Sequence, residues 1–165
     1  MNQDDTPRVL FVSSPTDIGA DTWIHLQLLR SLDPDRFELH AAGQIPARGK
    51  PSPAYDALSA IPRVKLRPTD FGPSFFLESK LEKVMRLRGF APAALSLAGL
   101  ARYIRQNDIQ VLHSTDRPRD AMACVLLGLA TGAKSVVHVH VKYGTWMSRG
   151  GCTRARCARY PTRRA

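Results

Sequence analysis

Residues 8–32 read Arg8-Val-Leu-Phe-Val-Ser-Ser-Pro-Thr-Asp-Ile-Gly-Ala-Asp-Thr-Trp-Ile-His-Leu-Gln-Leu-Leu-Arg-Ser-Leu32. The apolar run from Val9 to Ser13 is typical of a strand that is buried on both faces of a parallel sheet. A short loop with one glycine follows, and apolar residues then recur at helical spacing. A strand, loop and helix in this order usually place a ligand at the loop, because the strand's carboxyl end meets the helix's amino end there.

The helix that follows the loop is expected from Ala20 to Leu32, where Asp33-Pro34 ends it. Its spacing predicts an apolar face made of Ala20, Trp23, Ile24, Leu28, Leu29 and Leu32, and a polar face made of His25, Gln27 and Arg30.

The rest of the chain continues the alternation of strands and helices. Further strands are expected at 37–42, 64–66, 109–113 and 135–141, and helices at 75–88, 93–106 and 120–130. Gly89 and Pro92 separate the first two of these helices, and the Pro-rich residues 43–60 are expected to form an irregular connection. This pattern predicts an α/β fold: a Rossmann-like parallel sheet with helices on both faces and, from right-handed crossovers, the strand order 3-2-1-4-5.

Size and composition fit one domain with an appendage. The chain has 165 residues, of which 44% are hydrophobic. It contains no apolar run as long as a membrane-spanning helix, which needs roughly 18 residues. Its acidic N-terminal stretch Met1-Asn-Gln-Asp-Asp5 lacks the apolar region of a signal peptide, so a cytoplasmic protein is expected.

The positive charge is concentrated at the C-terminal end. The net charge is +10, and residues 142–165 contribute seven Lys or Arg without any Asp or Glu, which leaves +3 for residues 1–141. We therefore expect a domain over 1–148 and a basic irregular tail over 149–165. Three hypotheses apply to the tail: out-of-frame or truncated sequence, which we favour; an arm for nucleic acid or anionic membrane; and a metal site from Cys152 and Cys157.

Polar residues follow the first strand, where a parallel sheet binds ligands. Gly19 precedes the helix that begins at Ala20, and a glycine here lets a ligand approach the backbone, although a plain turn glycine fits equally well. Asp17 and Asp21 oppose a phosphate at this loop. The chain contains neither Gly-x-Gly-x-x-Gly nor a Gly-Lys-Ser/Thr phosphate loop, so a hydroxyl-rich sugar suits the loop better than a full phosphate cradle.

Histidines mark the ends of the fourth and fifth predicted strands. His138 and His140 alternate along one strand and therefore face the same side. His140, with Lys142 beyond it, could bind a hydroxyl or act in acid–base chemistry, whereas His138 and His113 are more simply structural. A metal site is not expected, because no Cys, Asp or Glu stands at matching spacing. Asp116 and Asp120 are expected to cap the helix over 120–130.

The order of these pieces over residues 8–148 resembles the N-terminal domain of family-4-type glycosyltransferases, the retaining enzymes of the GT-B fold. The resemblance rests on Ile18-Gly19-Ala20, on residues 32–40 (Leu-Asp-Pro-Asp-Arg-Phe-Glu-Leu-His), on the segment from Ile104 to His113 and on Val136-Val-His-Val-His140. It implies transfer of a sugar from a nucleotide-sugar donor without a metal. It also implies that Gly19 approaches the donor, that His140 contacts the donor sugar, and that Ala20, His113, His138 and Lys142 belong to the donor or acceptor site.

The chain departs from that family in two ways. Thr115 stands where the family often has a second histidine, and the C-terminal domain that binds the nucleotide-sugar is missing. Since charge stabilisation of a departing diphosphate is then not supplied, we expect the isolated chain to be inactive. The alternatives are a stand-alone sugar- or nucleotide-binding module that works with a separate subunit, and, less favoured, a basic nucleic-acid-binding protein.

The predicted helix over 75–88 carries Lys80, Lys83, Arg86 and Arg88 beside an apolar face, and could lie against an anionic membrane, which would suit a lipid-linked or cell-envelope acceptor. A helix packed on the domain with a solvated basic face is the simpler interpretation.

Overall fold

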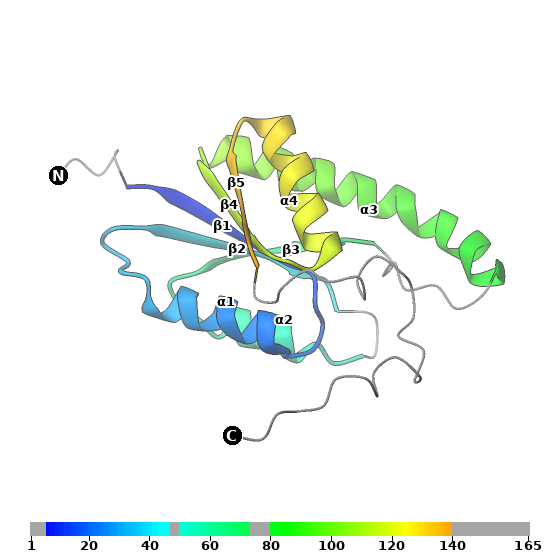
Figure 1. Cartoon of the computed structure of the whole chain (residues 1–165), viewed down its shortest axis with the longest axis horizontal. Helices are drawn as coiled ribbons and strands as arrows, with labels where there is room; N and C mark the ends of the chain where they lie inside the picture. Colours follow the sequence, from blue (N-terminus) through cyan, green and yellow to red (C-terminus); the bar gives the residue numbers. More distant parts are fainter. Residues whose placement is uncertain (1–5, 47–49, 73–79, 140–165) are drawn as a thin grey trace, which may run out of the picture.

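The computed structural model describes residues 6–46, 50–72 and 80–139, and it describes the side chains of these ranges except at 80–90. Its centre is a parallel sheet of β1 (Arg8–Ser13), β2 (Glu38–Gln44), β3 (Lys65–Thr69), β4 (Val111–Thr115) and β5 (Lys134–His138). The strand order is β3-β2-β1-β4-β5 (Figure 1). The predicted fold class and strand order are therefore confirmed, and the order of the strands reverses between β1 and β4.

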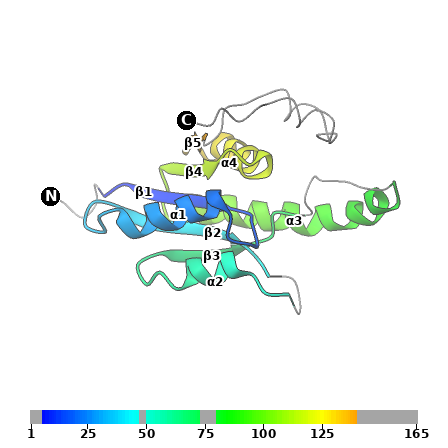
Figure 2. The same cartoon turned by 60° about the horizontal axis from the view of Figure 1, so that its bottom comes forward.

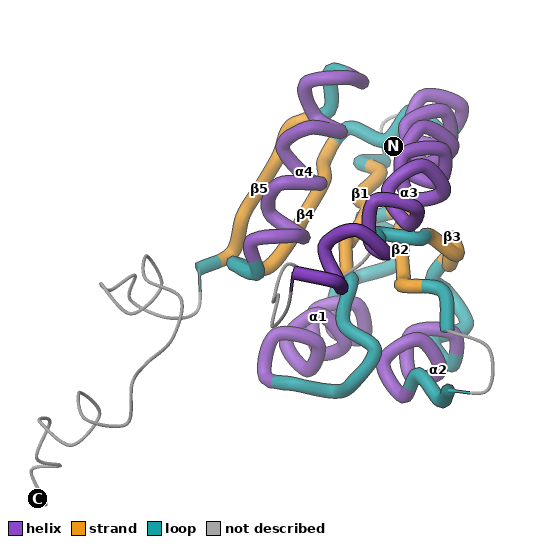
Figure 3. Tube along the Cα trace, turned by 90° about the vertical axis from the view of Figure 1, so that its right-hand side faces the viewer, coloured by secondary structure: helices purple, strands orange, loops and turns teal. Residues whose placement is uncertain are grey.

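Helices cover both faces of this sheet, as predicted. They are α1 (Ala20–Ser31), α2 (Pro53–Ser59), α3 (Lys80–Gln106) and α4 (Pro118–Thr131). Figures 1 and 3 show α1 and α2 together on one face and α3 and α4 together on the other.

Two apolar clusters hold the layers together. Alternate residues of β1 point to opposite faces, so that Leu10 is buried with Leu112 under α3 and α4, while Phe11 is buried under α1 and α2. The first cluster is completed by Leu100, Ile104 and Leu127, and the second by Leu26, Leu29, Leu39 and Leu58. The sequence predicted that the first strand is buried on both faces, and β1 confirms this.

The prediction of the buried face of α1 is wrong, because the observed buried face is rotated about the helix axis from the predicted one. The helix buries Thr22, His25, Leu26 and Leu29, whereas Trp23 is 52% exposed. The reason lies in the neighbours: the His25 ring packs edge-on against Phe11, with 5.3 Å between the ring centroids. The chemistry of the sheet surface that receives the helix, rather than the hydrophobicity of the helix alone, determines which side is buried.

Residues 43–60 are not wholly irregular, because α2 forms within them. The Ser52 side chain accepts a hydrogen bond from the backbone N–H of Tyr55, and Pro53 occupies the first turn, where its missing N–H costs nothing. The start of α2 also holds the loop after β1: the carbonyl of Thr16 accepts from the N–H of Ala54 at 3.1 Å and from the Ser52 hydroxyl at 3.3 Å.

The predicted break between two helices at Gly89 and Pro92 is also wrong. The chain forms one helix, α3, of 27 residues with Pro92 inside it. Ala93, Leu100 and Ile104 are buried against the sheet, and this packing stabilises the helix beyond the proline. The amino-terminal part of α3 extends past the sheet (Figure 2).

Several sequence predictions lie outside the described residues. These are the end of the fifth strand with His140, Lys142, the tail over 149–165 with Cys152 and Cys157, and the side chains of the basic helical stretch up to Arg88. Within the described ranges, no helix is both long enough and apolar enough to cross a membrane.

Candidate functional site

A cleft of about 430 Å³ opens at the carboxyl ends of β1 and β2. Ligands of open parallel sheets bind at this edge, beside the point where the strand order reverses. The loop after β1, the start of α1, the loops after β2 and β3 and the start of α4 surround the cleft, with the lining residues Ser14, Pro15, Thr16, Asp17, Ile18, Gly19, Gln44, Ile45, Gly72, Arg117 and Arg119. The predicted site loop therefore lines a real concavity.

Arg119 joins three parts of this edge. Its Nε donates to the Ser14 hydroxyl at 2.9 Å, and its Nη2 donates to the Ser14 carbonyl at 2.8 Å. Its Nη1 donates to the carbonyl of Gly72, beyond β3, also at 2.8 Å. Burial lowers the pKa of the Arg119 guanidinium, and the neighbouring Asp120 opposes that shift. Arg119 thus connects α4 to the loops after β1 and β3.

Asp120 also binds the loop after β1. Its side chain is buried, and Oδ2 accepts the backbone N–H of Ser14 at 3.2 Å. The predicted capping role is wrong, because Arg117 is the N-cap residue of α4 and no side chain caps this helix. Burial raises the pKa of Asp120, while the hydrogen bonds from Ser14 and the charge of Arg119 lower it.

This burial gives a pH-dependent prediction. Because the pKa of Asp120 is raised on folding, the native state holds this proton more tightly than the unfolded state, and stability falls as pH rises through the raised pKa. Asp120→Asn keeps an oxygen for the Ser14 N–H and removes the buried charge. The free energy of unfolding of the variant is expected to exceed that of the parent by about 1 kcal/mol at neutral pH. This difference is expected to shrink toward pH 4. Urea titrations across pH measure this; a less stable variant at neutral pH would contradict it.

Arg117 and Asp21 form an ion pair at the mouth of the cleft. The guanidinium of Arg117 binds the Asp21 carboxylate, and the side chains are 47% and 14% exposed. Asp21 was predicted to oppose a phosphate at this loop, and in the structure Arg117 compensates its charge. Arg117, Arg119 and Asp17 are therefore the charged residues that line the cleft, and Asp21 binds Arg117 beside it.

Gly19 is the N-cap residue of α1, with an extended backbone (φ −104°), and Ala20 begins the helix beside the cleft without lining it. A Cβ atom at Gly19 would lie 2.9 Å from Asp21 Oδ1 and 3.6 Å from the Arg117 guanidinium. The backbone conformation does not require glycine here, since φ is negative. The small size of Gly19 instead leaves room for the ion pair and for approach to the cleft.

Of the predicted histidines, the described His113 and His138 do not line the cleft. His113 is the third residue of β4 rather than its last, and it faces α1, with its ring 4.8 Å from Phe11 and 5.2 Å from His25. His138 ends β5, and its ring lies 5.8 Å from that of His113. The rings of His25, His113 and His138 therefore follow one another from α1 across β4 to β5. The row places His113 and His138 together, while His140 and Lys142 lie outside the described residues.

Five residues line the cleft although the sequence did not lead us to predict them as site residues: Gln44, Ile45, Gly72, Arg117 and Arg119. Arg117-Pro118-Arg119 follows the fourth strand directly, so two basic residues beside the switch point were a visible signal. Gln44 gave no such signal. Its side chain accepts from the N–H of Phe71 at 3.1 Å and so fixes the loop after β3.

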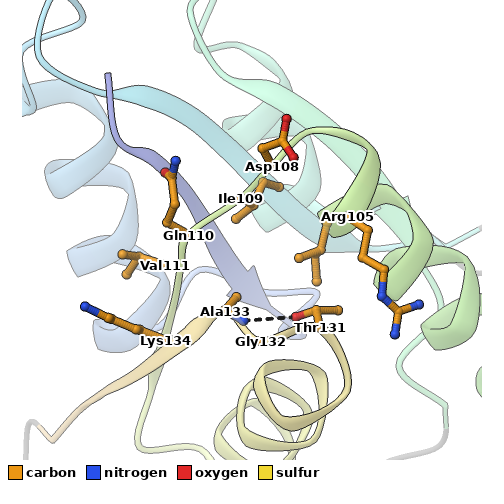
Figure 4. Close-up of a pocket in the computed structure, with 10 residues that line it drawn as sticks. Arg105, Asp108, Ile109, Gln110, Val111, Thr131, Gly132, Ala133 and Lys134 are labelled. Carbon is orange, nitrogen blue, oxygen red and sulfur yellow. Dashed lines mark hydrogen bonds between the residues drawn. The ribbon is translucent and has the colours of Figure 1, made fainter. Parts of the chain in front are cut away.

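A larger cleft, of about 650 Å³, lies at the opposite edge of the sheet. Arg105 and Lys134 are its basic residues, and Figure 4 shows their side chains pointing away from each other. Since it faces the amino ends of β4 and β5, it is not the usual ligand edge of a parallel sheet. Across the ranges with described side chains, no three His, Cys, Asp or Glu residues are grouped to hold a metal ion.

This chain resembles known proteins in its fold and not in its sequence. The sequence matches no protein-family model and no curated protein sequence. The C-terminal domain of the PF1911 hydrogenase from Pyrococcus furiosus has a similar fold, with a TM-score of 0.50 and 10% identity, and the match covers 84% of this chain and 95% of that one. This likeness shows that the sheet alone does not determine one chemistry.

Two glycosyltransferase structures share the fold over most of the chain. MurG from Acinetobacter baumannii matches with a TM-score of 0.57 and 13% identity over 86% of this chain, and TcCGT1, solved in complex with UDP, matches with a TM-score of 0.52 and 14% identity over 84%. The chain spans 38% of the MurG chain and 29% of the TcCGT1 chain. Its fold is thus the Rossmann-like fold of one half of a GT-B glycosyltransferase.

Proposed function

We propose that this chain is the N-terminal, acceptor-side half of a GT-B glycosyltransferase and that its cleft contacts a nucleotide-sugar. The observation that carries the proposal is the position of the cleft, at the carboxyl edge of a GT-B-like sheet and beside the β1–β4 switch point. The loop that holds Gly19 borders this cleft, which supports the role first inferred for it from the sequence.

The charges of the cleft favour a hydroxyl-rich group over a phosphate. Arg119 already donates three hydrogen bonds to the protein, and Arg117 is paired with Asp21. A diphosphate would have to compete with these partners, whereas sugar hydroxyls can both donate to the carboxylates and accept from the guanidinium groups. We therefore propose that the sugar of the donor, or an acceptor sugar, occupies the cleft.

The finer parts of the proposal come from the family resemblance. They are retention of configuration, contact of His140 with the donor sugar, contributions of Ala20, His113, His138 and Lys142 to binding, and a lipid-linked or cell-envelope acceptor. Within the cleft, the guanidinium groups of Arg117 and Arg119 are both engaged with protein groups, so we propose binding without turnover by this chain alone.

A binding titration with the full chain tests the proposal. UDP- and GDP-hexoses are expected to bind weakly, in the range typical of half of a two-domain site, with the free nucleotides binding more weakly than the nucleotide-sugars. Gly19→Leu is expected to weaken binding at least tenfold, because the new side chain would enter the space between the loop and the Asp21–Arg117 pair. The readout is isothermal calorimetry, with sugar transfer and hydrolysis followed in parallel.

The matched control is Gly99→Leu. Gly99 lies in α3, and a Cβ there meets nothing within 4 Å. Equal binding by the two leucine variants would contradict the assignment of the cleft. Preferred binding of free nucleotide would favour the stand-alone nucleotide-binding module, and turnover by this chain would contradict the proposal of binding without transfer.

A further inference from the structure

The sheet has two edge strands, and the sequence of the first of them, β3, prevents further pairing. Lys65, Arg67 and Pro68 are exposed on this strand. The carbonyl of Thr69 accepts from the N–H of Ile45 beside β2, so the alternation of a parallel strand turns the backbone of Pro68 toward the free edge, where it offers no N–H. Charged side chains and a proline at an edge keep another strand from pairing there.

The other edge strand, β5, lacks this protection. It pairs with β4 and with no other strand of the described residues. The N–H of Lys134 bonds to the carbonyl of Gln110, so the backbone groups of Ser135 and Val137 point away from β4. From residue 135 to the 49% exposed Val139, the sequence contains no proline and no Lys, Arg, Asp or Glu. The free edge of β5 is therefore open to a further strand.

Helix α4 presents exposed apolar side chains beside this edge. Met122, Val125 and Leu129 follow the i, i+3, i+7 spacing of a seam between two helices, and Leu129 is 80% exposed. Val125 lies three residues before Gly128, where a Cβ would lie 2.2 Å from the Ser135 hydroxyl of β5. Residues at this spacing share one side of a helix, so the apolar seam of α4 borders β5.

The position of α4 over the sheet matches what a second copy of the chain requires. Helix α4 packs on both β4 and β5 (Figure 3), and the Cys124 thiol lies 3.5 Å from the carbonyl oxygen of Leu112 and 4.0 Å from that of Val136. Neighbouring strands are about 4.8 Å apart, so a two-fold axis just beyond β5 would place the α4 helices of two copies two strand spacings, or roughly 10 Å, apart. Packed helices lie at about this distance, roughly 8–10 Å.

We propose that two copies of this chain form a dimer in which their β5 strands pair in antiparallel orientation and their α4 helices pack against each other. When Val137 lies opposite Val137 of the second copy, Ser135 lies opposite Val139, and the outward N–H and C=O groups bond across the edge. Lys134 is the only Lys, Arg, Asp or Glu between residues 121 and 139, so an anionic partner finds little to bind here. The surface shares no residue with the cleft, and the proposal is therefore independent of the proposed function.

Sedimentation equilibrium of the full chain, from micromolar to submillimolar concentration, tests the proposal. We expect a reversible dimer with twice the 18.3 kDa mass of the chain. Leu129→Glu is expected to raise the dissociation constant of the dimer at least tenfold, because a carboxylate from each copy would enter the apolar seam. Val137→Pro is expected to have an effect of similar size, since it removes an outward N–H from each copy and no bond to β4.

Leu95→Glu is the matched control. Leu95 is 75% exposed and lies on α3, so the same change of charge is made away from β5. This variant is expected to change the dissociation constant by no more than twofold. If circular dichroism shows that Val137→Pro is unfolded, Val139→Pro is used instead, since Val139 follows the last residue of β5 and is 49% exposed.

Three results would overturn the proposal. The first is a monomer at every concentration, as expected if the edge of β5 is covered by something other than a second copy. The second is a dimer that Leu129→Glu and Leu95→Glu weaken equally. The third is a dimer that the folded proline variant leaves unchanged, because the β5 strands would then not be paired.

Discussion

Arg119→Ala is expected to lower the free energy of unfolding by about 2–4 kcal/mol, because the change removes three donors from a partly buried site. Both the hydroxyl and the carbonyl of Ser14 would lose a partner, and so would the carbonyl of Gly72. Asp120 would also lose its nearest cation while remaining buried. Urea unfolding followed by circular dichroism measures the loss.

Arg117→Ala is the control for this prediction. Arg117 lies two residues before Arg119, but its side chain is 47% exposed and binds the carboxylate of Asp21. Exposed ion pairs contribute about 0–1 kcal/mol, so this variant is expected to remain within 1 kcal/mol of the parent. Equal losses for the two arginine variants would show that Arg119 does not hold the carboxyl edge together.

The second large effect is expected at Gly128, where alanine should lower the free energy of unfolding by about 1–3 kcal/mol. A Cβ at this position would lie 2.2 Å from the Ser135 hydroxyl and 2.9 Å from the carbonyl oxygen of Ala133. The Ser135 hydroxyl is not free to move away without loss, because it donates to the carbonyl of Cys124 at 2.9 Å. The clash would therefore force α4 away from β5.

Gly99→Ala separates this clash from helix propensity. Both glycines lie inside helices, but a Cβ at Gly99 meets nothing within 4 Å. Alanine there is expected to raise the free energy of unfolding by about 0.5–1 kcal/mol, since it restricts the unfolded chain and favours the helix. Thermal unfolding of the two variants should give shifts of opposite sign; a stabilising shift at Gly128 would mean that β5 is not packed against α4 in this way.

The sheet could be predicted from the sequence, whereas some helix boundaries could not. The central strand β1 is an apolar run, and right-handed crossovers leave few ways to order the strands around it. The continuity of α3 across Pro92 depends on Leu100 and Ile104 packing against the sheet, and a local rule about proline does not include this packing. The helix α2 carried a readable signal in Ser52-Pro53, which the surrounding prolines obscured.

The candidate site was predicted in position but not in composition. The carboxyl edge and the Gly19 loop followed from topology alone. The pairing of Asp21 with Arg117 joins residues that are 96 positions apart, so no local pattern could reveal it. The position of His113 depended on where β4 ends, and a shift of two residues moved it from the strand's end to its middle.

The central claim is that the carboxyl-edge cleft is the part of this chain that meets a nucleotide-sugar. Amide chemical-shift mapping of the labelled 18.3 kDa chain during titration with UDP- and GDP-hexoses tests it most directly. The expected result is a set of shifts centred on Ser14, Thr16, Gly19 and Arg117. The claim would be contradicted by unchanged spectra up to millimolar ligand, or by shifts gathered at the opposite edge around Gly132 and Lys134.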